Sequence, residues 1–255
     1  ALRYHKAYAD AISALKRHSN QDDIRANPGI SVKLSALHPR YEATQKAHML
    51  PVMIERLKSL ASAARDARMG LNIDAEEADR LDLSLDVIEA VLAEPELAGW
   101  DGFGVVVQAY GPRAPFVLDW LHDLAERLDR RIMVRLVKGA YWDTEIKRTQ
   151  EGGFSDFPVF TRKEATDVSY LAAARRLIAD PEAFYPMFAT HNAHTVVAIS
   201  EMVRSAGIGA ASYEFQRLHG MGGPLYNQLV DENGQFGCRI YAPVGGHVDL
   251  LAYLV

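Results

Sequence analysis

The sequence has a single cysteine, Cys238, among its 255 residues. One cysteine excludes an internal disulfide and a metal site built from several cysteines, and it fits a reducing compartment. No stretch approaches the run of about 18 apolar residues that a membrane-spanning helix needs. The segment 1–15 also lacks the continuous apolar core of a secretory signal. These absences do not exclude attachment to a membrane surface.

An excess of positive charge is absent as well. The chain carries 28 Lys and Arg against 33 Asp and Glu, which gives a formal net charge of -5. Binding to nucleic acid requires a concentrated positive surface, because neutralising the phosphates supplies much of the affinity. We therefore expect no nucleic-acid contact from this segment.

What the chain does have is a regular alternation of short β-rich runs and long helical patterns. The runs are ISVKLSAL (30–37), LNIDAE (71–76), FGVVVQAY (103–110), IMVRLVKG (132–139), PMFATHN (186–192), ASYEFQRL (211–218) and CRIYAPVG (238–245). Helical patterns separate them, and one more helix is expected over residues 2–17. Such alternation predicts an α/β fold with parallel strands joined by right-handed crossovers.

The seven runs suit either an open doubly wound sheet or a closed barrel. Polar residues near the carboxyl ends of nearly all the strands favour the barrel, because an open sheet would gather its chemistry at one switch point. The chain stops inside a helical pattern, HVDLLAYLV. We therefore expect a (βα)8 TIM-like barrel over residues 29–255, with its eighth strand missing and its last helix truncated. An N-terminal helical arm and linker occupy residues 1–28.

Four charged residues interrupt strands that would otherwise be apolar: Lys33, Asp74, Arg135 and Glu214. Isolated buried charges are costly, so such groups are normally paired or bound to a charged ligand. Each one alone could be part of a structural ion pair. Together, near strand ends, they favour a functional site.

Three further segments add polar groups at the ends of predicted strands. Residues 135–143, RLVKGAYWD, join two cations to Gly139, where the backbone can approach a ligand closely. Residues 161–163, Thr-Arg-Lys, offer donors suited to phosphate oxygens, although a solvated helix start would look the same. Residues 190–192, Thr-His-Asn, end a strand and open a helix, where anions bind well. The three segments suit a ligand that resembles a dinucleotide.

Two other interpretations stay open at this point. His38, His191, His194 and His219 with Asp74 could form the metal site of a barrel hydrolase, although their spacing is loose and we expect no metal. A flavin-free barrel that serves only as a structural part of a larger protein is the other alternative.

Seven motifs carry a resemblance to a known family. They are ISVKLSALHPRYE, LNIDAEEADRL, GVVVQAY, VRLVKGAYWD, FATHN, YEFQRLHGMG and CRIYAPVG. In this order they closely resemble the proline dehydrogenase domain of bifunctional proline utilization A proteins, over nearly all of residues 29–255. The resemblance implies noncovalent FAD at the carboxyl-end mouth of the barrel. It also implies oxidation of L-proline to Δ1-pyrroline-5-carboxylate by hydride transfer, with a membrane quinone as the final acceptor.

The resemblance also implies roles for particular residues. The catalytic group would be Arg135, Lys33 and Asp74, with Arg135 near the hydride-accepting nitrogen of the flavin. The FAD-binding residues would be Gln108, Arg135, Val137, Lys138, Gly139, Ala140, Trp142, Thr161, Lys163, Thr190, His191, Asn192 and Glu214. The substrate-binding residues would be Lys33, Asp74, Tyr141, Leu218, Tyr241 and Tyr253.

One departure from the family pattern concerns the carboxylate of proline. In the family, two adjacent arginines directly after the Tyr-Leu-Val of the eighth helix bind it, and here the sequence ends at Val255. We expect a chain of this extent to bind proline poorly, because two-point arginine contacts to carboxylates are strong. The resemblance further implies an aldehyde dehydrogenase domain in the parent chain, and a cytoplasmic protein that associates peripherally with the membrane during turnover.

Overall fold

The computed structural model describes residues 1–233 and 237–245, and for residues 230–233 it describes the backbone alone. Its seven strands are β1 (Gly29–Val32), β2 (Gly70–Ile73), β3 (Phe103–Gln108), β4 (Ile132–Val137), β5 (Phe184–Ala189), β6 (Glu214–Leu218) and β7 (Cys238–Tyr241). They form one sheet in the order β1-β2-β3-β4-β5-β6-β7, and every neighbouring pair is parallel. All seven predicted strands are confirmed. In the described part of the chain, β1 and β7 are the two edges.

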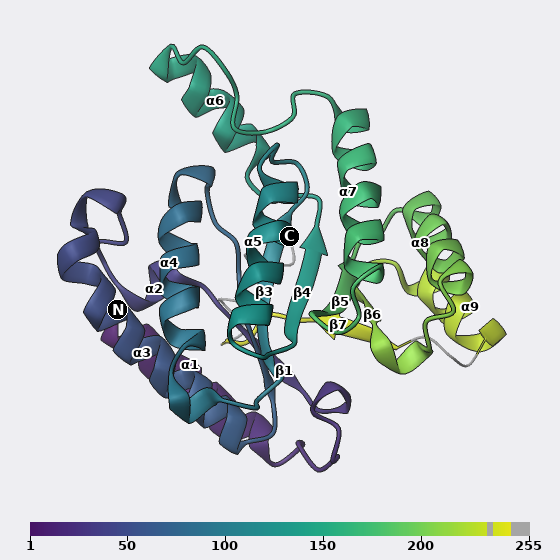
Figure 1. Ribbon diagram of the computed structural model, residues 1–255, viewed down its shortest axis with the longest axis horizontal. Coiled ribbons are helices and arrows are strands. Elements are labelled where there is room, and N and C mark those ends of the chain that lie inside the picture. Colours follow the sequence, from purple (N-terminus) through teal and green to yellow (C-terminus); the bar gives the residue numbers. More distant parts are fainter. Residues whose placement is uncertain (234–236, 246–255) are drawn as a thin grey trace.

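The helices flank this sheet, as Figure 1 shows. They are α1 (Leu2–Lys16), α2 (Leu34–Leu37), α3 (Lys46–Asp66), α4 (Leu81–Leu92), α5 (Ala114–Arg127), α6 (Trp142–Gly152), α7 (Lys163–Ile178), α8 (Ala193–Ser205) and α9 (Gly223–Asn233). No helix within 1–233 or 237–245 combines the length and the apolar character needed to cross a membrane.

The main core lies between the outer face of the sheet and the helices. Alternate strand residues such as Leu71 and Ile73 are fully buried there, because successive side chains of a strand point to opposite faces. In α5, Leu118, Leu121 and Leu124 recur at helical spacing and are also fully buried. The opposite face of the sheet remains for polar side chains.

The first strand is shorter than the sequence predicts. The run 30–37 was expected to be one strand, but β1 ends at Val32 and a one-turn helix, α2, follows. Leu34 and Leu37 are three positions apart and both fully buried, so the apolar run hides a change from strand to helical spacing. This early end places Lys33 at the junction between β1 and α2.

The N-terminal helix α1 lies beside α3 (Figure 1). His5 Nε2 is 2.8 Å from Ser59 Oγ, and Ile12 is buried in the main core. The Tyr8 hydroxyl accepts a hydrogen bond of 3.2 Å from the backbone N–H of Lys33. The expected helix over residues 2–17 is therefore confirmed, and it contacts the start of the barrel. The domain boundary at residue 28 stays a prediction.

Candidate functional site

A cavity of about 530 Å³ lies between α1, β1 and β7 and reaches the inner face of the sheet. Lys33, Asp74 and Arg135 all line it. These residues come from the ends of β1 and β2 and from the fourth position of β4. The fold thus brings together the three residues predicted to be catalytic, as expected for neighbouring parallel strands.

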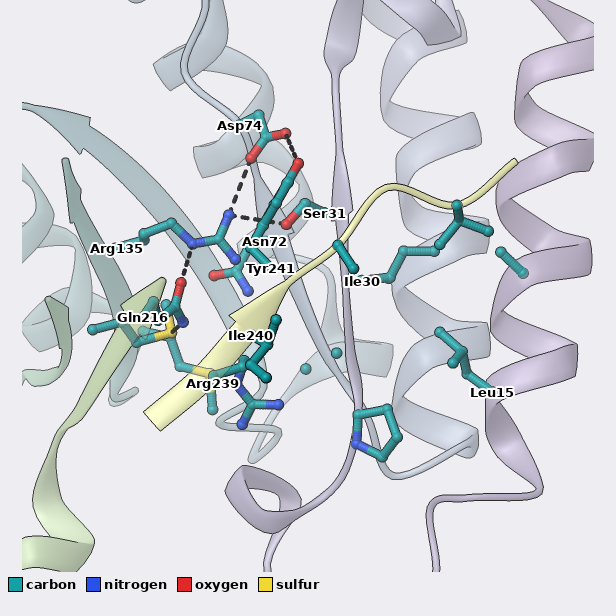
Figure 2. A pocket seen from close by; sticks show the side chains of 18 of the residues that line it. Leu15, Ile30, Ser31, Asn72, Asp74, Arg135, Gln216, Arg239, Ile240 and Tyr241 are labelled. Atoms are coloured by element: carbon teal, nitrogen blue, oxygen red, sulfur yellow. Dashed lines mark hydrogen bonds and ion pairs between the residues drawn. The ribbon is translucent and has the colours of Figure 1, made fainter. Parts of the chain in front are cut away.

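Arg135 is the centre of a buried polar cluster, shown in Figure 2. Its Nε donates to Gln216 Oε1 at 2.6 Å, and its Nη1 donates to Ser31 Oγ at 2.9 Å and to Asp74 Oδ1 at 3.2 Å. Only 7% of the Arg135 side chain and 16% of the Asp74 side chain are exposed. The guanidinium is therefore held from three directions, and its pKa is lowered by burial while Asp74 acts in the opposite direction.

Asp74 links this cluster to β7. The Tyr241 hydroxyl donates to Asp74 Oδ2 at 3.3 Å, and the Arg135 guanidinium lies 5.1 Å from the centre of the Tyr241 ring. Burial raises the pKa of the Asp74 carboxyl, while Arg135, Lys33 and the Tyr241 hydroxyl act in the opposite direction. The carboxylate thus joins three of the predicted residues.

Lys33 points toward Tyr141, which follows β4. Its Nζ lies 3.5 Å from the Tyr141 hydroxyl and 6.0 Å from the centre of that ring. Burial disfavours the charged ammonium, but Tyr141, Asp74 and Glu76 outweigh it and raise the pKa of Lys33. A cation that bonds to a neutral hydroxyl is suited to receive the carboxylate of a small ligand.

The segment after β4 is tied to the end of β3. Gln108 Oε1 accepts from the backbone N–H of Ala140 at 3.1 Å, and its Nε2 donates to the carbonyl of Glu76 at 2.9 Å. Gly139 has φ +147°, and a Cβ there would lie 2.2 Å from the Tyr110 ring. No other residue fits this turn without strain. Val137 ends β4, and Trp142, which begins α6, donates from Nε1 to the carbonyl of Phe160 at 2.9 Å.

Two lysines share one carboxylate at the start of α7. Lys163 Nζ lies 2.5 Å from Asp167, and Lys138 binds the other oxygen of the same carboxylate. Both lysines lower the pKa of Asp167. Thr161 is exposed just before the helix. Since one negative charge is shared by two positive ones, this group can still bind an anion.

The start of α8 shows why residues 190–192 end one element and begin another. Asn192 Oδ1 accepts from the backbone N–H of Thr195 at 3.0 Å, which is the usual bond of a helix cap. Thr190 Oγ1 accepts from the N–H of Asn192 at 3.2 Å. His191 Nε2 accepts from the N–H of Leu218 at 3.0 Å, so this nitrogen is unprotonated. Burial, with Arg217, lowers the pKa of His191.

A family model described as proline dehydrogenase matches residues 1–255. The chain belongs to the proline dehydrogenase family. Within this family it is 56% identical to the "Bifunctional protein PutA" of Klebsiella aerogenes, over all of this chain and 20% of that protein. It is 54% identical, with the same coverage, to the protein of that name in Escherichia coli (strain K12). The proline dehydrogenase domain thus spans about a fifth of the length of these relatives.

Solved structures agree with this assignment. A proline utilization A mutant (D779Y) from Bradyrhizobium japonicum matches with a TM-score of 0.94 and 53% identity, over 99% of this chain and 26% of that one. A proline utilization A from Bdellovibrio bacteriovorus, inactivated by N-propargylglycine, matches with a TM-score of 0.92 and 28% identity over 99% and 27%. These likenesses confirm both the TIM-like architecture and the resemblance seen in the motifs.

Tyr253 and Glu214 are two of the predicted site residues of the proline dehydrogenase domain. Tyr253 lies outside the described residues, as does the helical pattern 247–255 that contains it. Glu214 is the first residue of β6, so it lies at the end of the strand away from Leu218, which closes it. Its carboxylate bonds to Arg239 and Gln216. Within the protein the Glu214 carboxylate is thus directed to its neighbours in the sheet, and its contact with the cofactor stays a prediction.

Gln216 is a site residue that the sequence analysis missed. It is almost fully buried and donates to Glu214 while accepting from Arg135. Within the strands only charged residues stood out, and the family motifs added other amides, Gln108 and Asn192, but not Gln216. The signal was nevertheless present, since Glu214, Gln216 and Leu218 alternate along β6 and so share one face.

The histidines considered for a metal site do not gather within residues 1–233 and 237–245. In this part of the domain, the one group with ligand atoms close enough for a metal ion is His122, Asp123 and Glu126 on α5. His122 Nε2 already lies 2.8 Å from Asp180. His191 is occupied by the Leu218 amide instead.

The donor set fits FAD as the family resemblance implies. Nη2 of Arg135 donates to none of the described residues, so buried N–H groups remain for a polar ring edge. Lys138 and Lys163 together exceed the one carboxylate that they share, which suits a diphosphate. The helix start at Asn192 adds the positive end of the α8 dipole.

Proposed function

We propose that this domain oxidises L-proline to Δ1-pyrroline-5-carboxylate with noncovalently bound FAD. The observation that carries the proposal is the buried cluster of Arg135 and Asp74, with Lys33 beside it, in a chain that belongs to the proline dehydrogenase family. Asp74 balances the charge of Arg135, but Lys33 bonds to the neutral hydroxyl of Tyr141, which leaves a cation beside the pair for an anionic ligand group. A small zwitterionic substrate next to a polar cofactor supplies such a group.

The substrate residues would each act on a different part of proline. The Lys33 ammonium receives the carboxylate, which fixes the ring carbon that faces the cofactor. Asp74 and Tyr241 form the side of the pocket next to Arg135. Tyr141 and Leu218 would form walls around the aliphatic ring, and the family resemblance adds Tyr253; such walls exclude water from the reacting atoms. A proton leaves the amine to water.

The cofactor would lie across the carboxyl ends of β3 to β6. When bound, FAD accepts the hydride from the ring carbon beside the amine. Arg135 would stand at the hydride-accepting nitrogen, and the turn formed by Val137, Gly139 and Ala140 would approach the ring. The remaining parts of the cofactor would be bound by Gln108, Lys138, Trp142, Thr161, Lys163, Thr190, His191 and Asn192. Beside its predicted contact with the cofactor, we assign Glu214 an indirect role through Gln216.

The larger protein would connect this reaction to others. We propose a membrane quinone as the final electron acceptor, and a cytoplasmic protein that binds the membrane peripherally while it turns over. The relatives called "Bifunctional protein PutA" are about five times as long as the matched region. An aldehyde dehydrogenase domain in the parent chain would oxidise the product further.

Absorbance spectroscopy of the purified protein tests the proposal. The flavin-loaded protein under anaerobic conditions should lose its visible absorbance on addition of L-proline and keep it on addition of D-proline. A flavin spectrum that L-proline leaves unchanged contradicts the proposal. Protein that binds no flavin supports a structural barrel, and stoichiometric metal supports the hydrolase alternative.

A further inference from the structure

A row of polar side chains continues from Arg135 toward the amino ends of β6 and β7. Gln216 and Glu214 are two positions apart on β6, so both point to the inner face of the sheet. They are only 2% and 5% exposed. Arg239 on β7 pairs with Gln216 in the strand register, and Figure 2 labels Arg135, Gln216 and Arg239.

The amide of Gln216 has one orientation that satisfies both of its neighbours. Its Oε1 accepts from Arg135 Nε at 2.6 Å, and its Nε2 donates to Glu214 Oε1 at 2.6 Å. Turned by half a rotation, the amide would set N–H groups against the guanidinium and its oxygen against the carboxylate. Buried groups left unpaired in that way are costly. The Glu214 carboxylate therefore makes Gln216 present an acceptor to Arg135.

Glu214 is in turn held by Arg239. Arg239 Nε lies 2.8 Å from Glu214 Oε1, and Nη2 lies 3.1 Å from Oε2. The other donors of Arg239 reach the carbonyls of Asn27 at 2.8 Å and Arg25 at 2.5 Å, in the segment before β1. Glu214 raises the pKa of Arg239 against the effect of burial. The Glu214–Arg239 pair therefore holds the Glu214 carboxylate next to the Gln216 amide, inside the sheet.

We propose that Arg239 and Glu214, acting through Gln216, position the guanidinium of Arg135 in the candidate site. Neither Glu214 nor Arg239 bonds to Lys33, Asp74 or Tyr241, so they are positioning residues and not catalytic ones. The consequence for turnover rests on the proposed function, since Arg135 is assigned there to the cofactor. The coupling among the four side chains does not depend on that assignment.

A double-mutant cycle on the flavin-loaded protein tests this inference. Glu214→Gln should lower kcat/KM for L-proline by about 10- to 100-fold, mostly through kcat, because small displacements of a catalytic group have effects of that size. In an Arg135→Met background the same change should have no further effect, since the role of Glu214 passes through Arg135. Asp180→Asn is the matched control, a half-buried carboxylate that pairs with His122, and should leave kcat/KM unchanged.

Additive losses in kcat/KM would overturn the inference, because a merely structural role for Glu214 does not require Arg135. Gln216→Met breaks the same link while it keeps the Glu214–Arg239 pair, and it replaces Glu214→Gln in the cycle if that variant does not fold. Urea unfolding of the four proteins without substrate gives a second reading. A wild-type protein that does not oxidise proline rejects the proposed function, and non-additive unfolding midpoints then still support the positioning role while additive ones reject it.

Discussion

Two carboxylates of this domain bind cations in opposite settings. Asp74 lies inside the sheet and shares its oxygens between Arg135 and Tyr241, whereas Asp167 lies at the start of α7 and holds two lysines. The Asp74 side chain is 16% exposed and its pKa is raised, while Asp167 is 31% exposed and its pKa is lowered. Burial therefore decides the sign for Asp74, and the nearby lysines decide it for Asp167.

The difference teaches what each site can tolerate. In the interior, Nε and Nη1 of Arg135 have defined acceptors that fix the guanidinium, and the loss of one charged partner leaves the other charge buried and uncompensated. At the start of α7, which we call the rim, Lys138 and Lys163 remain in contact with water. Solvent replaces a lost partner there at little cost. We expect substitutions to affect folding and chemistry in the interior, and ligand binding alone at the rim.

The largest effect is expected for Arg135→Met. This change leaves Asp74 buried without its cation, which should lower the free energy of unfolding by about 3–5 kcal/mol and reduce proline oxidation to a small but measurable residual rate. Urea unfolding and an activity assay check both. Arg127→Met is the matched control, because Arg127 pairs with Glu89 at the surface with 54% of its side chain exposed; its loss should cost at most about 1 kcal/mol. Equal losses of unfolding free energy in Arg135→Met and Arg127→Met would contradict the expected difference between interior and surface charges.

A smaller effect is expected for Asp74→Asn. The amide oxygen can still accept from Arg135 and the amide NH2 can donate to the Tyr241 hydroxyl, but the charge is lost, so the free energy of unfolding should fall by about 1–3 kcal/mol. KM for proline should rise, because Asp74 forms one side of the proposed pocket. Steady-state kinetics and urea unfolding measure the two quantities. An unchanged KM would remove Asp74 from the substrate site.

Protonation of His191 should have a moderate and pH-dependent effect. The folded pKa lies below the unfolded value of 6.5, so the stabilisation is fully present above that pH and is lost as the pH falls toward the folded pKa. Protonation also breaks the bond from the Leu218 amide. His191→Gln should flatten the fall in Tm as the pH drops below 6.5. An equally steep fall in the variant would show that other groups cause it.

The smallest effect on folding is expected for Lys163→Gln. Its side chain is 69% exposed and Asp167 keeps Lys138 as a partner, so Tm should not change. Affinity for FAD should fall a few-fold at low salt, with the difference shrinking as salt screens the exposed charge. Isothermal titration at two ionic strengths measures this. A salt-independent loss of affinity would place Lys163 in a more buried contact than the rim position implies.

Much of the fold follows from local patterns in the sequence. Seven apolar runs separated by helical patterns suffice to predict the strands and their parallel order, because short crossovers leave few alternatives. The predicted end of β1 was wrong, because Leu34 and Leu37 extend an apolar run whose second half forms a helix. The β-rich composition of this segment indicates a strand, whereas the spacing of Leu34 and Leu37 indicates a helix. Burial of both side chains in the core favours the helix.

The candidate site was only partly visible in the sequence. Lys33, Asp74 and Arg135 stand out because charge is rare in buried parallel strands. Gln216 does not stand out, although it bonds to Arg135 directly. The sequence also does not identify Arg239 as the partner of Glu214. The two residues are 25 positions apart, and only the structure shows which face of β7 carries Arg239. Sequence reveals which charges are unusual, and packing reveals which neighbours hold them.

The bond from Arg239 to the carbonyl of Asn27 spans 212 positions in the chain. A contact between segments so far apart closes a large loop. The chain loses the conformational entropy of that loop before the contact can contribute to stability. We therefore expect the interior around Arg135 to become ordered late in folding. During synthesis the first four strands can assemble early, but the polar cluster that joins Arg135 to Arg239 is complete only after β7 has left the ribosome.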